Sequence, residues 1–214
     1  MLDFNVRLPI ALALALALAL ASTTDPVRAQ DAQTSPSAPV ERLTATLLEA
    51  MKNADTLGFE GRLDKLSEVM PDVFNFELMA RLSAGRHWRE LSEAEQQSFV
   101  EQFGRMSTAT FAARFDGYSG QSFEVLAPRD GPRGTKLVPT RIVKPAGDSV
   151  SIDYLVRQFD NSWRVVDVYL AGKYSEVAAK RAEYTSIIER DGFPALIKRL
   201  KSKIASLKAG AAGE

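Results

Sequence analysis

The chain has 214 residues, with 27 Lys and Arg against 27 Asp and Glu, and it has no cysteine. The balanced charge gives no global field to attract nucleic acid, and the lack of cysteine excludes disulfides, thiolate metal sites, a cysteine nucleophile and an acylated lipoprotein anchor. The length predicts one domain that is stabilised by the packing of its core.

The N-terminus has the features of an export signal. Arg7 precedes an uninterrupted apolar run from Ile10 to Ala21. This run has the length of a signal-peptide hydrophobic region and is short for a membrane span of roughly 20 residues. Small-x-small sites end at Ala21 and Ala29, and the second leaves a polar spacer after the apolar run. Residues 1–29 are therefore predicted to be a signal peptide, with an uncleaved anchor as the alternative.

The next residues, 30–40, are rich in Gln, Asp, Thr, Ser, Ala and Pro. Such a segment buries too little apolar surface to offset the entropy lost on ordering, so it is predicted to be a flexible polar linker. A single domain is expected over residues 41–208, followed by a disordered tail at 209–214.

Helical periodicity begins near Val40 and predicts a first helix that reaches Asp55. A short second helix is expected to stop at Met70, because the residue before a proline is disfavoured in a helix. Pro71 would then open a third helix that ends at Gly85. The buried stripe of the first helix is expected to contain Leu43, Leu47, Ala50 and Met51, and that of the third Phe74, Leu78 and Leu82.

A capping box opens the next helix, since Ser92 and Glu95 can each accept a hydrogen bond from the backbone of the other. The apolar stripe of this helix is broader than contact with one neighbour requires. It contains Phe99, Phe103, Met106, Phe111 and Phe115. These side chains are expected to form core, and a subset of them to contact a ligand.

After Gly117 the apolar residues alternate, which predicts strands. The expected strands are 121–127, 135–143, 149–159 and 163–171, and their short connections imply an antiparallel meander. With a three-residue turn at 160–162, Ile152 faces Leu170, Tyr154 faces Val168 and Val156 faces Val166. One side of the sheet is then nearly continuously apolar, which supports this register.

The opposite side of the predicted sheet carries Arg141, Asp153, Arg157 and Asp167. Asp153 and Asp167 form the best available carboxylate pair for an enzyme. The register, however, puts Arg157 diagonal to Asp167 and Arg141 diagonal to Asp153, so ion pairs on a solvated face explain all four without catalysis.

Two helices are predicted to close the chain. The stripe of the first is expected to contain Tyr174, Val177, Arg181, Tyr184 and Ile188. The second, at 194–208, is strongly amphipathic, and its outer face carries Lys198, Arg199, Lys201, Lys203 and Lys208. This basic face would suit transient contact with anionic lipid headgroups, and it would equally suit a solvated surface whose charges favour the helix dipole.

No residue pattern predicts a cofactor or a metal. His87 is the single histidine, and it has no nucleophile elbow or second histidine near it in sequence. It is therefore expected to make a local hydrogen bond. The chain also lacks a phosphate-binding glycine loop and clustered metal ligands, so no catalytic residues are predicted.

These elements predict an α+β fold in which several helices pack on a curved four-stranded antiparallel sheet, of the cystatin or NTF2-like kind. A curved sheet under helices can leave an apolar cavity. The residues expected to line it and to bind lipid are Phe103, Phe111, Val138, Ile152, Tyr154, Val166 and Val168. A filled core would use the same side chains.

Several strings within residues 41–207 resemble the MlaC family, also called toluene-tolerance auxiliary proteins. They are Pro71-Asp-Val-Phe-Asn-Phe-Glu-Leu-Met-Ala-Arg81, Gly85-Arg-His-Trp-Arg89, strand 150–157, and Trp163-Arg-Val-Val-Asp167 followed by Gly172. Asn75 departs from the Asp of many relatives. The strings Ser175-Glu176 and Arg181-Ala-Glu-Tyr184 are more similar to the hopanoid-biosynthesis-associated HpnM branch.

The resemblance implies a non-enzymatic periplasmic carrier that holds acyl chains between helices and sheet. Its cargo would be a phospholipid or a hopanoid, and its partners an inner-membrane ABC transporter complex and an outer-membrane lipoprotein complex. The alternatives are an accessory protein of an envelope complex that binds no lipid, and a small NTF2-like enzyme that uses Asp153 and Asp167.

Overall fold

The computed structural model describes residues 35–211, so the signal peptide predicted at 1–29 lies outside the described residues. The C-terminal boundary of the predicted linker, at residue 40, lies too far along the chain. A helix begins at Ala38, with Pro39 in its first turn and Val40 fully buried, so the last residues of that segment belong to the folded domain. The predicted tail is helical up to Ala211.

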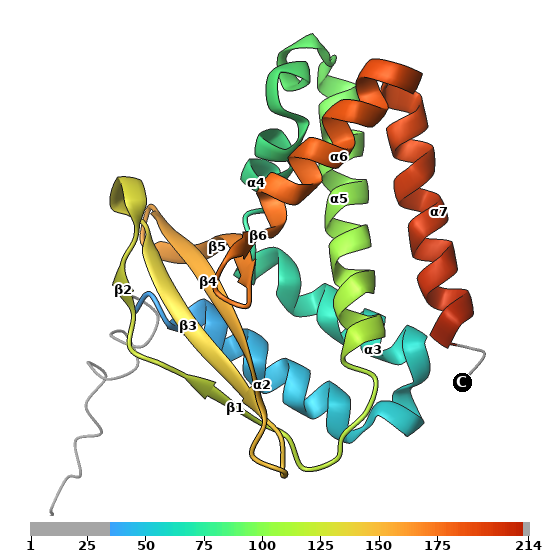
Figure 1. Cartoon of the computed structure of the whole chain (residues 1–214). Coiled ribbons are helices and arrows are strands. Elements are labelled where there is room, and N and C mark those ends of the chain that lie inside the picture. Colours follow the sequence, from blue (N-terminus) through green and yellow to red (C-terminus); the bar gives the residue numbers. More distant parts are fainter. Residues whose placement is uncertain (1–34, 212–214) are drawn as a thin grey trace, which may run out of the picture.

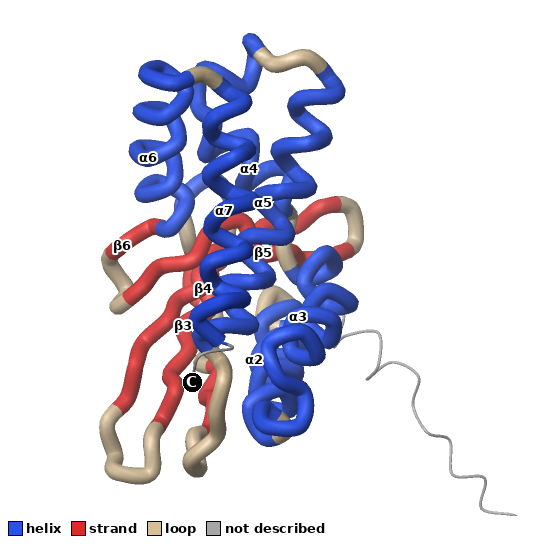
Figure 2. Tube along the Cα trace, turned by 90° about the vertical axis from the view of Figure 1, so that its right-hand side faces the viewer, coloured by secondary structure: helices blue, strands red, loops and turns tan. Residues whose placement is uncertain are grey.

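Six α-helices in the described part of the chain lie on one side of the sheet (Figure 1). They are α2 (Ala38–Lys52), α3 (Ala54–Val73), α4 (Phe76–Ala84), α5 (Glu93–Arg114), α6 (Glu176–Asp191) and α7 (Phe193–Ala211). A 3-10 helix, η1 (Gly85–Glu90), connects α4 to α5. Figure 2 shows α7 running alongside α5, with the sheet behind and below them. The predicted stripe of α2 is buried.

The path between α3 and α4 differs from the prediction. The helix kinks at Gly58, where φ is 57°, and then continues through Pro71 to Val73. Proline is tolerated there because the last turn is still closed, with the Phe74 N–H donating to the Met70 carbonyl at 2.8 Å. Helix α4 begins instead at Phe76 and is capped by Asn75, whose Oδ1 accepts from the Leu78 N–H at 2.9 Å. An Asp at this position would make the same cap.

The later start of α4 changes which residues it buries. Its buried residues are Met79, Ala80, Ser83 and Ala84. Leu82, which was predicted to be in the stripe, is 43% exposed, and Phe74 is buried but lies in the break before the helix. Gly85 ends α4 at a φ of 60°, as predicted.

The predicted capping box of α5 is confirmed. Ser92 Oγ accepts from the Glu95 N–H, and the Glu95 carboxylate accepts from the Ser92 N–H at 2.9 Å. The Ser92 hydroxyl also donates to the Glu95 carboxylate at 2.7 Å, and this bond, together with that from the Ser92 N–H, lowers the pKa of Glu95. Further along α5, the Phe99 ring packs edge-on against Tyr184 of α6 and Phe193 of α7, at centroid distances of 5.9 and 6.0 Å. This aromatic cluster holds the three helices together.

The sheet has six strands rather than the predicted four. They are β1 (Ser122–Val125), β2 (Arg129–Asp130), β3 (Lys136–Val143), β4 (Ser149–Phe159), β5 (Ser162–Leu170) and β6 (Tyr174–Ser175). The order is β1-β3-β4-β5-β6, with β2 also paired to β3, and every pair is antiparallel. The four longer strands correspond to the predicted ones, although β1 covers only 122–125 of the predicted 121–127. Strands β2 and β6 have only two residues each, too few to show alternation.

The predicted register of β4 and β5 is correct at one end and wrong at the other. Tyr154 pairs with Val168, as predicted, but Val156 pairs with Val165 because a bulge follows Leu155. The turn also has two residues rather than three, so Phe159 pairs with Ser162. Because of the bulge, the Val165 side chain points into the core and is fully buried. Val166 is the extra residue of β5 that has no partner on β4.

The prediction that the other face of the sheet is solvated is also wrong in part, because Asp153 and Asp167 are only 6% and 8% exposed. Asp153 pairs with Arg129 at 3.2 Å, and the turn at Gly172 lies against its carboxylate. Arg141 and Arg157 also have partners other than the predicted aspartates. Arg141 contacts Glu124 of β1 at 3.1 Å, and Arg157 lies over the ring of Phe159.

Asp167 fixes the start of α6 on the sheet. Its Oδ1 accepts from the N–H groups of Val168 and Val177, at 2.8 and 3.1 Å, and its Oδ2 accepts from the Ser175 hydroxyl at 2.5 Å. Ser175 Oγ in turn caps the Ala178 N–H. From this start α6 buries Val177, Tyr184 and Ile187, whereas Tyr174 precedes the helix and is 70% exposed, contrary to the prediction.

We expect Asp167→Ala to lower the free energy of unfolding by about 2–4 kcal/mol, because a buried carboxylate that joins β5, β6 and α6 is lost. Urea unfolding followed by circular dichroism measures the loss. Asp148→Ala, in the exposed turn between β3 and β4, is the matched control and should change stability by less than about 0.5 kcal/mol. Equal losses in the two variants would contradict this role of Asp167.

Candidate functional site

An apolar cavity of about 90 Å³ lies between the helices and the sheet. From the helix side it is lined by Phe76, Thr110 and Phe111, and from the sheet by Ile152, Tyr154, Val168 and Leu170. Arg114, Glu176 and Lys180 are its charged lining residues. Since Arg114 is exposed and the other two are half-buried, these three mark the side on which the cavity reaches the surface.

Four of the seven residues predicted to line a cavity do so, namely Phe111, Ile152, Tyr154 and Val168. The other three are Phe103, Val138 and Val166. Phe103 is fully buried against Phe76 and Phe99, Val138 is fully buried on β3, and Val166 occupies the bulge. Lipid contact by any of the seven stays a prediction. Burial raises the pKa of Tyr154 above its ordinary value, which further favours the neutral phenol.

Sequence reasoning missed several lining residues. Leu170 was identifiable, because the predicted register already placed it opposite Ile152. Phe74 and Phe76 were not, because both were assigned to a continuous helix from Pro71. In the structure the helix breaks at these residues, and the Asn75 N–H donates to the Val165 carbonyl of β5 at 2.9 Å. This bond brings both phenylalanines to the cavity.

Phe74 and Phe76 separate the cavity from a second pocket. Their rings are stacked, with centroids 5.5 Å apart and planes within 3°. Both border the inner cavity, and both also border a surface groove of about 470 Å³ between α3, α4 and α5. Gly104 lets Phe76 approach α5 closely, since a Cβ at that position would lie 3.1 Å from the ring. A movement of Phe76 alone would therefore alter the wall between the two spaces.

The carboxylates proposed for an enzyme are engaged in structural bonds. Asp153 holds Arg129, and Asp167 holds Ser175 and the amide at the start of α6. Within residues 35–211, no group of three His, Asp or Glu residues is placed to hold a metal ion. In the same range no helix is both long and apolar enough to cross a membrane.

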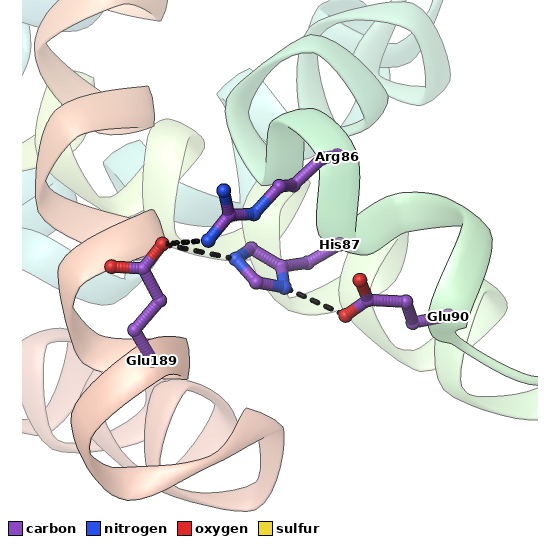
Figure 3. A network of polar contacts seen from close by, with 4 residues as sticks. All are labelled: Arg86, His87, Glu90 and Glu189. Carbon is purple, nitrogen blue, oxygen red and sulfur yellow. Dashed lines mark hydrogen bonds and ion pairs between the residues drawn. The ribbon is translucent and has the colours of Figure 1, made fainter.

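His87 takes part in a polar network apart from the cavity (Figure 3). Its Nδ1 lies 2.7 Å from a Glu90 oxygen, and its Nε2 lies 3.6 Å from Glu189, which also pairs with Arg86 at 2.5 Å. The network joins η1 to α6. The predicted local hydrogen bond of His87 is confirmed, and within residues 35–211 the polar partners of its ring are the carboxylates of Glu90 and Glu189.

The structure therefore defines an α+β protein with an apolar cavity between a helical layer and an antiparallel sheet. Comparison with known families identifies it further. The profile described as MlaC protein matches residues 41–202, and the chain belongs to this family. A search of curated proteins found no match.

Among solved structures, the chain is similar to a phospholipid-binding protein from Ralstonia solanacearum, solved in complex with a phospholipid. The TM-score is 0.67 at 21% sequence identity, over 81% of this chain and 98% of that chain. At this identity the likeness establishes the shared fold.

The cavity predicts that substitutions of two valines on the same face of the sheet differ in their cost to the free energy of unfolding. Val168→Phe extends into the cavity and should cost less than about 1 kcal/mol of unfolding free energy, whereas Val156→Phe must displace packed core and should cost about 1–3 kcal/mol. Urea unfolding of both variants gives the difference. Equal costs would mean that the space beside Val168 is not available to a side chain.

Proposed function

We propose that this protein is a non-enzymatic periplasmic lipid carrier that holds an acyl chain between its helices and its sheet. The observation that carries the proposal is the apolar cavity beside Phe111, Ile152 and Val168, which opens beside charged residues in a protein of the MlaC family. The Ralstonia solanacearum relative in fold, with its bound phospholipid, supports the same reading.

Carriage would depend on the hydrophobic effect. Transfer of hydrocarbon from water to the cavity stabilises the complex by about 0.8 kcal/mol per buried CH₂. The cavity of about 90 Å³ is smaller than the roughly 300–1,000 Å³ of most ligand pockets, so loading requires it to enlarge.

The wall formed by Phe74 and Phe76 offers a route for this enlargement. Phe76 is half-buried and faces the groove of about 470 Å³ on its outer side. If its ring turned into the groove, the cavity would extend outward between α4 and α5 while the strands kept their pairing. Such a change breaks one aromatic stack, which is worth about 0.5–1.5 kcal/mol.

The proposal extends to the setting in which the carrier works. We expect an exported protein that exchanges lipid with an inner-membrane ABC transporter complex and an outer-membrane lipoprotein complex, with phospholipid as the leading cargo and a hopanoid as the alternative. The exposed basic face of α7 suits brief contact with anionic membranes. Of its five cations, Lys208 is paired, with Glu60 at 2.6 Å.

A second candidate is an accessory protein of an envelope complex that binds no lipid. The small volume of the cavity favours this reading, because the side chains already fill most of the space between helices and sheet.

The deciding experiment is extraction of the purified mature protein with organic solvent and mass spectrometry of the extract. We expect lipid at a stoichiometric level, and a loss of at least several-fold in Val168→Phe, whose side chain occupies the cavity. Val150→Phe is the matched control, since Val150 is 46% exposed on the neighbouring strand, and it should load normally. Lipid-free protein that also captures none from vesicles would support the accessory role.

Phe76→Ala tests the route of entry. Removal of the ring joins the cavity to the groove, so a fluorescent phospholipid should exchange between the protein and vesicles several-fold faster. Leu82→Ala, on the exposed side of the same helix, controls for general destabilisation of α4. Exchange at the wild-type rate in Phe76→Ala would reject this route and leave the cavity itself unaffected.

A further inference from the structure

Two cations from different helices stand together where the cavity reaches the surface. Arg114 is the last residue of α5, and Lys180 lies in the second turn of α6. Both line the cavity, together with the single acidic residue Glu176. The charged rim therefore carries a net positive charge beside apolar walls.

Neither cation forms a close ion pair within the described part of the chain. Across residues 35–211, the ion pairs of 4 Å or less include neither Arg114 nor Lys180. Burial lowers the pKa of Lys180, and the nearby charges of Arg114 and Lys203 act in the same direction. Glu176 and Glu183 raise this pKa, each more strongly than either cation lowers it, although neither forms a close pair with Lys180. An added anion would give the partly desolvated ammonium a direct counter-charge.

Local interactions account for the position of each cation taken alone, but they do not account for the two cations lying side by side. Arg114 favours the dipole at the C-terminus of α5, and the Lys180 ammonium lies 5.9 Å from the centroid of the Tyr184 ring. Neither effect requires two like charges at the edge of one cavity. With Lys203 of α7 close enough to act on Lys180, three helices contribute positive charge to this edge.

We propose that Arg114 and Lys180 bind the phosphate of an anionic lipid whose acyl chain enters the cavity. The inference rests on the proposed function and specifies its cargo. Guanidinium and ammonium groups both donate charge-assisted hydrogen bonds to phosphate oxygens. The apolar surroundings strengthen these bonds relative to water. A neutral polyol headgroup offers neither cation a direct charged partner, so the site selects a phospholipid over an uncharged hopanoid.

The test measures equilibrium binding of two probes with identical acyl chains, phosphatidylglycerol and diacylglycerol, both delivered from cyclodextrin so that no membrane surface is present. Wild-type protein should bind phosphatidylglycerol at least tenfold more tightly. Arg114→Gln and Lys180→Gln should each weaken phosphatidylglycerol binding about tenfold and leave diacylglycerol binding unchanged. Lys180→Arg should retain the preference. The matched control Lys144→Gln, in the exposed turn between β3 and β4, should behave as wild type.

The alternative outcomes are distinct. Equal wild-type affinity for the two lipids would overturn the phosphate site and leave the carrier proposal standing, whereas binding of neither lipid would overturn both. Equal weakening of both lipids by the Gln variants would show that the two residues shape the cavity rather than bind phosphate, which also overturns the inference. Inorganic phosphate alone should bind too weakly to compete, and tight binding of it would identify a free-phosphate site instead.

Discussion

The arrangement of the cavity depends on one backbone hydrogen bond, which runs from the Asn75 N–H to the Val165 carbonyl. It ties the break between α3 and α4 to β5 at the bulge, where Val165 turns into the core. Phe74 is thereby pressed against the sheet, and Phe76, one residue beyond Asn75, stacks on it from the start of α4. The helical layer and the sheet thus meet at a fixed point, and the cavity lies beside that point.

Asp167 provides the second attachment between the layers. Its carboxylate accepts from the buried amide of Val177 in the first turn of α6, which would otherwise lack a partner, and from the Ser175 hydroxyl of β6. Because α6 starts from this anchor, Glu176 and Lys180 come to the outer edge of the cavity. The residue that suggested an enzyme in the sequence therefore has a structural role, and it sets the position of the charged rim.

The sequence predicted those features that depend on neighbours along the chain. The Ser92 capping box, the four long strands and the pairing of Tyr154 with Val168 follow from local patterns and a short turn. The incorrect predictions concern features that are determined by contacts between residues far apart in the sequence. The bulge at Val166 reverses the alternation along β5, and α3 continues through Pro71 to Val73. Asp167 is buried beneath β6, whose Ser175 donates to its carboxylate. Phe76 was missed as a lining residue because its position depends on the long-range bond of Asn75.

The small cavity is energetically compatible with transport of a much larger ligand. At about 24 cal/mol per Å³, a hollow of about 90 Å³ costs the folded protein about 2 kcal/mol, which the burial of about three CH₂ groups would offset. Displacement of Phe76 costs about 1 kcal/mol of aromatic stacking, together with the exposure of part of its ring. An acyl segment of about ten CH₂ groups gains about 8 kcal/mol, which exceeds these costs. The closed form is thus the state expected without cargo, and the ligand itself supplies the free energy that opens it.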